Sequence, residues 1–230
     1  MEIVPSVDST DLQTLRQVTI FEFEMTVSRI FILLVIMLAT SQSVKAATIL
    51  VMGDSLSAAH GIELEQGWVN LLQIRLHEHE SEEKSWQVVN ASVSGETTAG
   101  GLKRLPDLLT KYKPQLCIIE LGANDGLRGM SMNNMQTNLN TMIGQCKRYG
   151  QVLLLGMQLP PNYGKKYTGE FKDSFELLAK QNEIAFVPFL LKGFAKDRRL
   201  FLADGFHPNA EAQGKILENV WPIIYLLLIK

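Results

Sequence analysis

Five residues of this sequence carry groups that could together cleave an acyl bond. Ser55 offers a hydroxyl, His207 an imidazole, and Asp204 a carboxylate three residues before that histidine. A serine hydroxyl becomes a useful nucleophile when a histidine takes its proton, and an acid that accepts the other ring N–H fixes the tautomer of the histidine. Gly95 and Asn124 offer a backbone N–H and a side-chain amide. Together with the N–H of Ser55, such donors could stabilise the oxyanion that acyl transfer creates.

The segments around these residues resemble the four blocks of the GDSL (SGNH) hydrolases, in their usual order. They read GDSLS at 53–57, NASVSGET around Gly95, LGANDGLRG around Asn124 and DGFHP at 204–208. The resemblance covers residues 47–225 and is closest to the periplasmic branch of acyl thioesterases, lysophospholipases and arylesterases. It implies an SGNH hydrolase fold.

The resemblance also implies a role for each of the five residues. Ser55 is the nucleophile, His207 is the base and Asp204 is its orienting acid. Ser55, Gly95 and Asn124 form the oxyanion hole. All five positions hold the residue type that the family requires.

The candidate residues follow short apolar segments. Apolar runs at 48–52, 87–90, 116–121, 152–157 and 185–189 alternate with segments of helical periodicity. Runs that are apolar along their length and separated by helices are typical of a parallel sheet covered on both faces. We therefore predict a three-layer α/β/α domain, with a flavodoxin-like, doubly wound sheet of five parallel strands. In such folds the site lies at the carboxyl ends of the strands.

The end of the chain carries a further apolar helical pattern, which is interrupted by Pro222. We expect the helix to break there, because proline lacks the N–H that an interior helical position donates. The apolar run at 223–229 is too short to span a membrane, which takes about 20 residues. We expect it to pack in the core; a membrane contact or a dimer contact is the alternative.

Composition excludes several classes of protein. With 46% hydrophobic and 20% charged residues, the chain is neither disordered nor collagen-like nor a coiled coil. Its net charge of −2 gives no support for binding nucleic acid or an anionic membrane. No Cys/His cluster has zinc spacing, and we expect neither metal nor cofactor. Cys117 and Cys146 fall in a strand pattern and a helix pattern, which predicts two buried thiols without a bridge.

The N-terminal region has the features of a secretory signal. Residues 30–39 form an uncharged apolar run, Arg29 precedes it, and small residues end at Ala46. We predict cleavage after Ala46, a periplasmic or secreted protein, and a single hydrolase domain at 47–230. Residues 1–24 are mostly acidic, unlike the start of a signal, so we predict that Met25 is the true start or that 1–24 are dispensable. An uncleaved hydrophobic anchor is the alternative.

Loops next to the predicted catalytic edge supply candidates for substrate contacts. These residues are His60, Leu127, Met130, Leu159, Tyr163 and Phe206. Ordinary loop packing is the alternative role for them. We expect Asp54 to form a turn, and we expect Asp125 and Arg128 to pair with each other or brace a loop.

Together these features predict a serine hydrolase that acts through an acyl-serine intermediate. The expected substrates are small acyl esters and thioesters, including fatty acyl esters, aryl esters and lysophospholipids. Two alternatives stay open, namely a carbohydrate acetylesterase and an inactive, secreted lipid-binding protein. We expect a monomer, no nucleic-acid partner and no stable membrane span in the mature chain.

Overall fold

The computed structural model describes residues 22, 23, 25, 46–79 and 85–229. The part from Lys45 to Lys230 is one compact unit. Three predictions concern residues 1–46, namely the signal, the start at Met25 and the cleavage after Ala46. Apart from residues 22, 23, 25 and 46, this segment lies outside the described residues.

A sheet of five parallel strands forms the centre of this unit, in the order β2-β1-β3-β4-β5. The strands are β1 (Ala47–Gly53), β2 (Trp86–Asn90), β3 (Leu116–Glu120), β4 (Gln151–Leu155) and β5 (Ala185–Val187). They coincide with the five predicted apolar runs, although the predictions for the last two extended two residues too far. The central strands β1 and β3 are buried along most of their length, as the apolar sequence requires.

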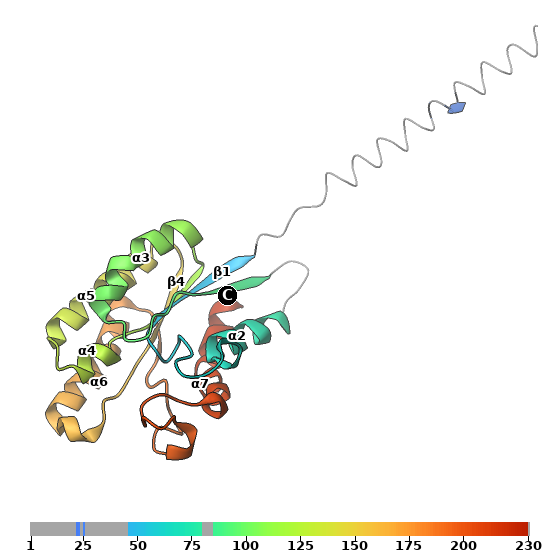
Figure 1. Cartoon of the computed structure of the whole chain (residues 1–230). Helices are drawn as coiled ribbons and strands as arrows, with labels where there is room; N and C mark the ends of the chain where they lie inside the picture. Colours follow the sequence, from blue (N-terminus) through green and yellow to red (C-terminus); the bar gives the residue numbers. More distant parts are fainter. Residues whose placement is uncertain (1–21, 24, 26–45, 80–84, 230) are drawn as a thin grey trace, which may run out of the picture. The chain divides into compact units, whose positions relative to one another are not determined.

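Helices cover both faces of the sheet (Figure 1). Helices α2 and α7 pack together on one face, and α3, α5 and α6 pack side by side on the other. The helices of the described part are α2 (Trp68–His77), α3 (Thr98–Tyr112), α4 (Ala123–Leu127), α5 (Met132–Cys146), α6 (Lys165–Asn182) and α7 (Ala210–Leu228). Three short 3-10 helices are η1 (Leu64–Gln66), η2 (Pro161–Tyr163) and η3 (Arg198–Leu200). The predicted three-layer α/β/α fold is confirmed.

The expected break at Pro222 is wrong, because α7 continues through this residue to Leu228. Proline removes one N–H donor, but the turns on both sides remain packed on the domain. Val220, Ile224 and Leu228 recur every four residues and are all buried, so one face of the helix stays anchored across the proline.

The apolar run after Pro222 is divided between core and surface. Ile224 and Leu228 belong to the core, whereas Tyr225, Leu226 and Ile229 are exposed. The expected core packing therefore holds for the face of α7 that carries Ile224 and Leu228, and not for the face that carries the exposed residues. Among the described residues, no helix is both long enough and apolar enough to cross a membrane.

The two cysteines are free and buried, as predicted. Cys117 lies in β3 and Cys146 ends α5. A hydrogen bond with Cys146, together with burial, raises the pKa of the Cys117 thiol, so this thiol is an unreactive core group.

Candidate active site

The carboxyl ends of three neighbouring strands bring the predicted residues to one edge of the sheet. Ser55 follows β1, Gly95 lies in the loop after β2, and Asn124 lies in α4 just after β3. The loop before α7 supplies Asp204 and His207. Because β2, β1 and β3 are adjacent and parallel, their carboxyl ends share an edge, which is where the doubly wound fold places a site.

Ser55, His207 and Asp204 form a continuous hydrogen-bonded chain. Ser55 Oγ lies 2.9 Å from His207 Nε2, and His207 Nδ1 lies 2.7 Å from Asp204 Oδ2. Asp204 Oδ1 accepts the N–H of Phe206 at 2.8 Å and the N–H of His207 at 3.0 Å. The side-chain hydrogen bond to His207 and these two backbone bonds lower the pKa of Asp204 to about 2. Asp204 is therefore ionised at neutral pH and can hold the Nδ1 proton of His207.

Gly95 and Asn124 lie beside this chain with donors available. Gly95 has a φ of 77°, a backbone conformation that favours glycine. In the described part of the chain, no hydrogen bond uses the N–H of Ser55 or of Gly95. The amide of Asn124 donates to Asp54 Oδ2 at 3.0 Å, which leaves its second N–H for a substrate. These three groups are suited to bind a developing oxyanion.

Asp54 shapes both its own turn and the neighbouring donor. Its Oδ1 accepts the N–H of Leu56 at 3.0 Å, which is the local turn that the sequence predicts. Its Oδ2 holds the amide of Asn124, a contact across 70 residues that the sequence analysis missed. Burial raises the pKa of Asp54 to about 6, although its bonds to Leu56 and Asn124 oppose that rise.

Of the two roles expected for Asp125 and Arg128, the structure shows loop bracing, and each residue braces separately. The Arg128 guanidinium donates to Gly95 O at 3.1 Å and to Asn124 Oδ1 at 3.4 Å, so it joins the two oxyanion donors. Asp125 accepts the N–H of Thr98 at 2.9 Å and its hydroxyl at 2.6 Å. The loops after β2 and β3 are thereby fixed to each other.

The sequence profile of the GDSL-like lipase/acylhydrolase family matches residues 51–215, which span all of these groups. The chain belongs to this family. The match confirms the predicted resemblance and the predicted enzyme class, a serine hydrolase that acts on ester bonds.

Relatives within the GDSL-like family cover most of this chain. Esterase TesA of Pseudomonas aeruginosa is 50% identical over 189 residues, which make up 82% of this chain and 92% of that protein. Thioesterase 1/protease 1/lysophospholipase L1 of Escherichia coli is 35% identical over 186 residues, 80% of this chain and 86% of that protein. The crystal structure of esterase EstA from Pseudoalteromonas sp., inhibited by monoethylphosphonate, has a TM-score of 0.74 and 38% identity. The matched region covers 80% of this chain and 99% of EstA.

His60 lies next to His207. The rings of His60 and His207 have centroids 4.3 Å apart. His60, Asp204 and His207 each offer a metal-ligating atom, and these atoms lie within 4.8 Å of one another. Both ring nitrogens of His207 are already used, one by Ser55 and one by Asp204. A cation at this cluster would therefore compete with the serine machinery rather than assist it.

The other candidate substrate residues differ in their exposure. Phe206 is 56% exposed, Met130 44% and Tyr163 37%, so all three present apolar surface to solvent. Leu127 is half-buried, and its carbonyl accepts the hydroxyl of Tyr163 at 3.1 Å. Leu159 is 7% exposed and belongs to the core, where its side chain packs as a structural residue.

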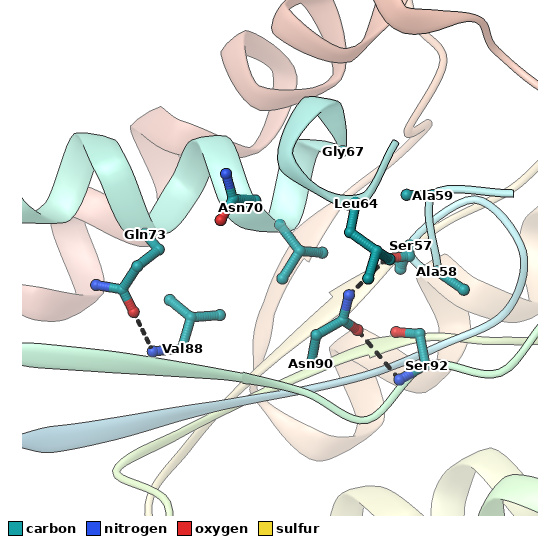
Figure 2. A pocket seen from close by; sticks show the side chains of 11 residues that line it. Ser57, Ala58, Ala59, Leu64, Gly67, Asn70, Gln73, Val88, Asn90 and Ser92 are labelled. Carbon is teal, nitrogen blue, oxygen red and sulfur yellow. Dashed lines mark hydrogen bonds between the residues drawn. The ribbon is translucent and has the colours of Figure 1, made fainter. Parts of the chain in front are cut away.

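A cavity of about 320 Å³ lies between α2 and β2, next to the turn that follows Ser55 (Figure 2). Its lining includes Ser57, Ala58 and Ala59 but none of the three residues of the hydrogen-bonded chain. Asn90 in this cavity donates to the carbonyl of Ser57 at 2.8 Å. The cavity wall therefore stabilises the turn that follows Ser55 through this hydrogen bond.

Sequence reasoning missed one buried acid of the site, Glu120. It ends β3 and accepts hydrogen bonds from Asp54 and Ser57 on either side of Ser55. A signal was present, since Glu120 is the one ionisable carboxyl in the apolar strand LCIIE. Acids are almost never fully buried unless they are paired or hydrogen-bonded.

Proposed function

We propose that Ser55, His207 and Asp204 are the catalytic triad of an esterase and thioesterase. The observation that carries the proposal is the unbroken chain from Ser55 Oγ through the imidazole of His207 to the Asp204 carboxylate. His207 Nε2 takes the Ser55 proton while Ser55 Oγ attacks the carbonyl carbon of the substrate. Asp204 keeps the proton on Nδ1 and stabilises the imidazolium that forms.

The tetrahedral intermediate places its oxyanion against three donors, the N–H groups of Ser55 and Gly95 and the amide of Asn124. His207 then gives its proton to the leaving alcohol or thiol, and the acyl-serine remains. Water, deprotonated by His207, attacks this ester in turn; the acyl–Oγ bond breaks, His207 returns the proton to Ser55 Oγ, and the carboxylic acid is released. Each oxyanion donor contributes roughly 3–4 kcal/mol to lowering the barrier.

We propose fatty acyl esters, acyl thioesters, aryl esters and lysophospholipids as the substrate classes. Support comes from the exposed apolar side chains of Met130, Tyr163 and Phe206 in the loops around the site. Further support comes from relatives named esterase and thioesterase/lysophospholipase. All groups of the site belong to one chain, so a monomer is sufficient for the reaction.

The test of the catalytic assignment is covalent labelling of Ser55. A fluorophosphonate probe is expected to label the wild-type enzyme at Ser55, and Ser55→Ala is expected to abolish labelling and hydrolysis. Full activity of Ser55→Ala would refute the assignment.

A panel of acetylated sugars and acyl esters of increasing chain length separates the proposed substrates from sugar esters. Preference for chains above about six carbons excludes the sugar acetylesterase alternative.

We also propose export with cleavage after Ala46, and either translation from Met25 or an N-terminal segment 1–24 that is dispensable. The apolar run at 30–39 and the preceding Arg29 support it. N-terminal sequencing of the protein from the exported fraction tests it. A mature chain that begins before Thr26 would contradict it.

A further inference from the structure

Glu120 is a carboxyl group enclosed beneath the turn that carries Ser55. It is the last residue of β3, it is 0% exposed, and its Cα pairs in register with that of Gly53. The preceding residues of the strand are apolar core residues. A carboxyl group in such surroundings is costly unless its polar atoms are satisfied, so its bonding partners are informative.

One oxygen of Glu120 holds both ends of the serine turn. Glu120 Oε2 accepts the N–H of Asp54 at 3.2 Å and the hydroxyl of Ser57 at 2.8 Å. Ser57 Oγ in turn accepts the indole N–H of Trp68 at 3.3 Å. Since an indole can only donate, the hydroxyl proton of Ser57 is free to point at Glu120. Oε2 therefore acts as a double acceptor, once before Ser55 and once after it.

Close packing fixes the position of the Glu120 carboxyl against the turn. A Cβ at Gly53 would lie 2.8 Å from Glu120 Oε2 and 2.6 Å from the Cβ of Ser57, distances that real side chains do not tolerate. The side-chain amide of Asn90 donates to the carbonyl of Ser57 at 2.8 Å. The turn from Asp54 to Ser57 is thus held between β3, α2 and β2.

The other oxygen of Glu120 indicates the charge state of this carboxyl group. Oε1 is buried and has no hydrogen-bond partner in the described part of the chain. An ionised carboxylate would leave this oxygen charged and unpaired in the core, which is strongly unfavourable. Burial, with the neighbouring Asp54 carboxylate, raises the pKa of Glu120 well above its usual range. The neutral form of the Glu120 carboxyl is therefore favoured.

We propose that Glu120 is a positioning residue of the hydrolase. It fixes the Asp54–Ser57 turn from below and so sets the direction of Ser55 Oγ toward His207. Through Asp54, whose Oδ2 holds the Asn124 amide, it also sets the direction of one oxyanion donor. The inference rests on the proposed function, because it assigns Glu120 a role in that ester hydrolysis.

Two substitutions at Glu120 separate positioning from mere stability. Glu120→Gln keeps an uncharged side chain with an acceptor oxygen in the place of Oε2, so kcat is expected to stay within about threefold of wild type. Glu120→Ala leaves the Asp54 N–H and the Ser57 hydroxyl without an acceptor. We expect its kcat to fall about 100-fold with KM within about threefold, because Ser55 Oγ and the Asn124 amide lose their alignment together, a combined effect that approaches the 10²–10³ of removing an oxyanion donor.

The controls use the same strand and the same turn. Cys117→Ala also removes buried atoms from β3, and it is expected to lower the midpoint of urea unfolding while leaving kcat unchanged. Ser57→Ala removes one of the two donors to Glu120, and its kcat is expected to fall roughly fivefold to tenfold. This variant decides the question if Glu120→Ala does not fold.

Several outcomes would overturn the role of Glu120. They are full kcat in a folded Glu120→Ala or in Ser57→Ala, or a Glu120→Gln variant as slow as Glu120→Ala. Fluorophosphonate labelling of wild-type Ser55 is measured in parallel. Failure of that labelling rejects the proposed function itself, whereas successful labelling with an unaffected Glu120→Ala rejects only the positioning role.

Discussion

The imidazole rings of His60 and His207 face each other with their centroids 4.3 Å apart and their planes tilted by 42°. His60 lies on the turn after Ser55, and its backbone N–H donates to the carbonyl of Ser55 at 3.2 Å. The turn that carries Ser55 therefore places a second imidazole against that of His207. With Asp204, the two rings bring three metal-ligating groups together at the reacting atoms.

This arrangement predicts inhibition by zinc. Imidazole and carboxylate are ordinary zinc ligands, and a zinc ion bound to His207 would block its proton transfer. His60→Leu is expected to raise the zinc concentration for half-inhibition at least about tenfold, since even outer contacts of a metal site change affinity by that much. Titration of ester hydrolysis with ZnCl₂ measures it, and excess EDTA alone is expected to leave activity unchanged.

The matched control is His79→Leu. His79 is an exposed histidine that packs on Trp221 of α7, with ring centroids 5.1 Å apart. Its removal is expected to leave zinc inhibition as in the wild type. Equal inhibition of His60→Leu and wild type would show that His60 does not contribute a ligand.

Arg128 is predicted to align the oxyanion hole without touching the nucleophile. Its guanidinium joins Gly95 O and Asn124 Oδ1, so Arg128→Ala leaves both donors present but less constrained. We expect kcat to fall about tenfold with KM nearly unchanged, less than the 10²–10³ that follows loss of a donor. The kcat of Arg128→Lys is expected to lie between those of wild type and Arg128→Ala, because an ammonium lacks the planar fork that bridges two acceptors.

Steady-state kinetics on a short-chain aryl ester measures this effect. Arg199→Ala is the control, since Arg199 is an exposed arginine paired with Asp197, and its kcat is expected to match the wild type. An Arg128→Ala enzyme that loses substrate affinity but keeps kcat would point to a substrate-binding role instead.

Asp54 is predicted to make stability depend on pH in the direction opposite to an ordinary paired acid. Burial raises its pKa from 3.8 to about 6, so folding favours the protonated form. Its contribution to stability is fully present below pH 3.8 and is lost as pH rises through 6. Relative to Asp54→Asn, which cannot titrate, the wild type should lose on the order of 3 kcal/mol over this interval.

Urea unfolding of both proteins between pH 4 and pH 8 measures the difference. A difference in unfolding free energy that stays constant with pH would contradict a raised pKa for Asp54. The same Asp54→Asn variant is expected to have a lower kcat, because its amide would present an N–H to the N–H of Asn124 if its oxygen kept the bond to Leu56. The fold is expected to persist, so this loss would report on the oxyanion donor.

Burial of Leu159 and continuity of α7 show where local patterns were insufficient. Leu159 follows an apolar strand, and its local sequence is compatible with lining an open groove or with packing inward; in the structure it is buried in the hydrophobic core. Pro222 removes one hydrogen-bond donor from the helix, but α7 continues through it because buried residues on both sides keep one face of the helix packed on the core. In both cases the free energy of apolar burial outweighs the local preference.

The sequence by itself determined the strands, the parallel sheet and the residues at its catalytic edge. Apolar runs spaced by helices leave few alternatives to a doubly wound sheet, and in such a sheet the carboxyl ends of neighbouring strands must meet. Ser55, Gly95, Asn124, Asp204 and His207 could therefore be placed together without coordinates.

Only the tertiary structure decided how that edge is held. The bonds from Glu120 to Asp54 and Ser57, from Asn124 to Asp54 and from Arg128 to Gly95 join residues that are 33 to 70 positions apart. They depend on the register that sets Gly53 opposite Glu120, and a shift of one residue would turn the Glu120 side chain to the other face of the sheet. Register and close packing follow from the whole core, so no local pattern in the chain could have revealed these contacts.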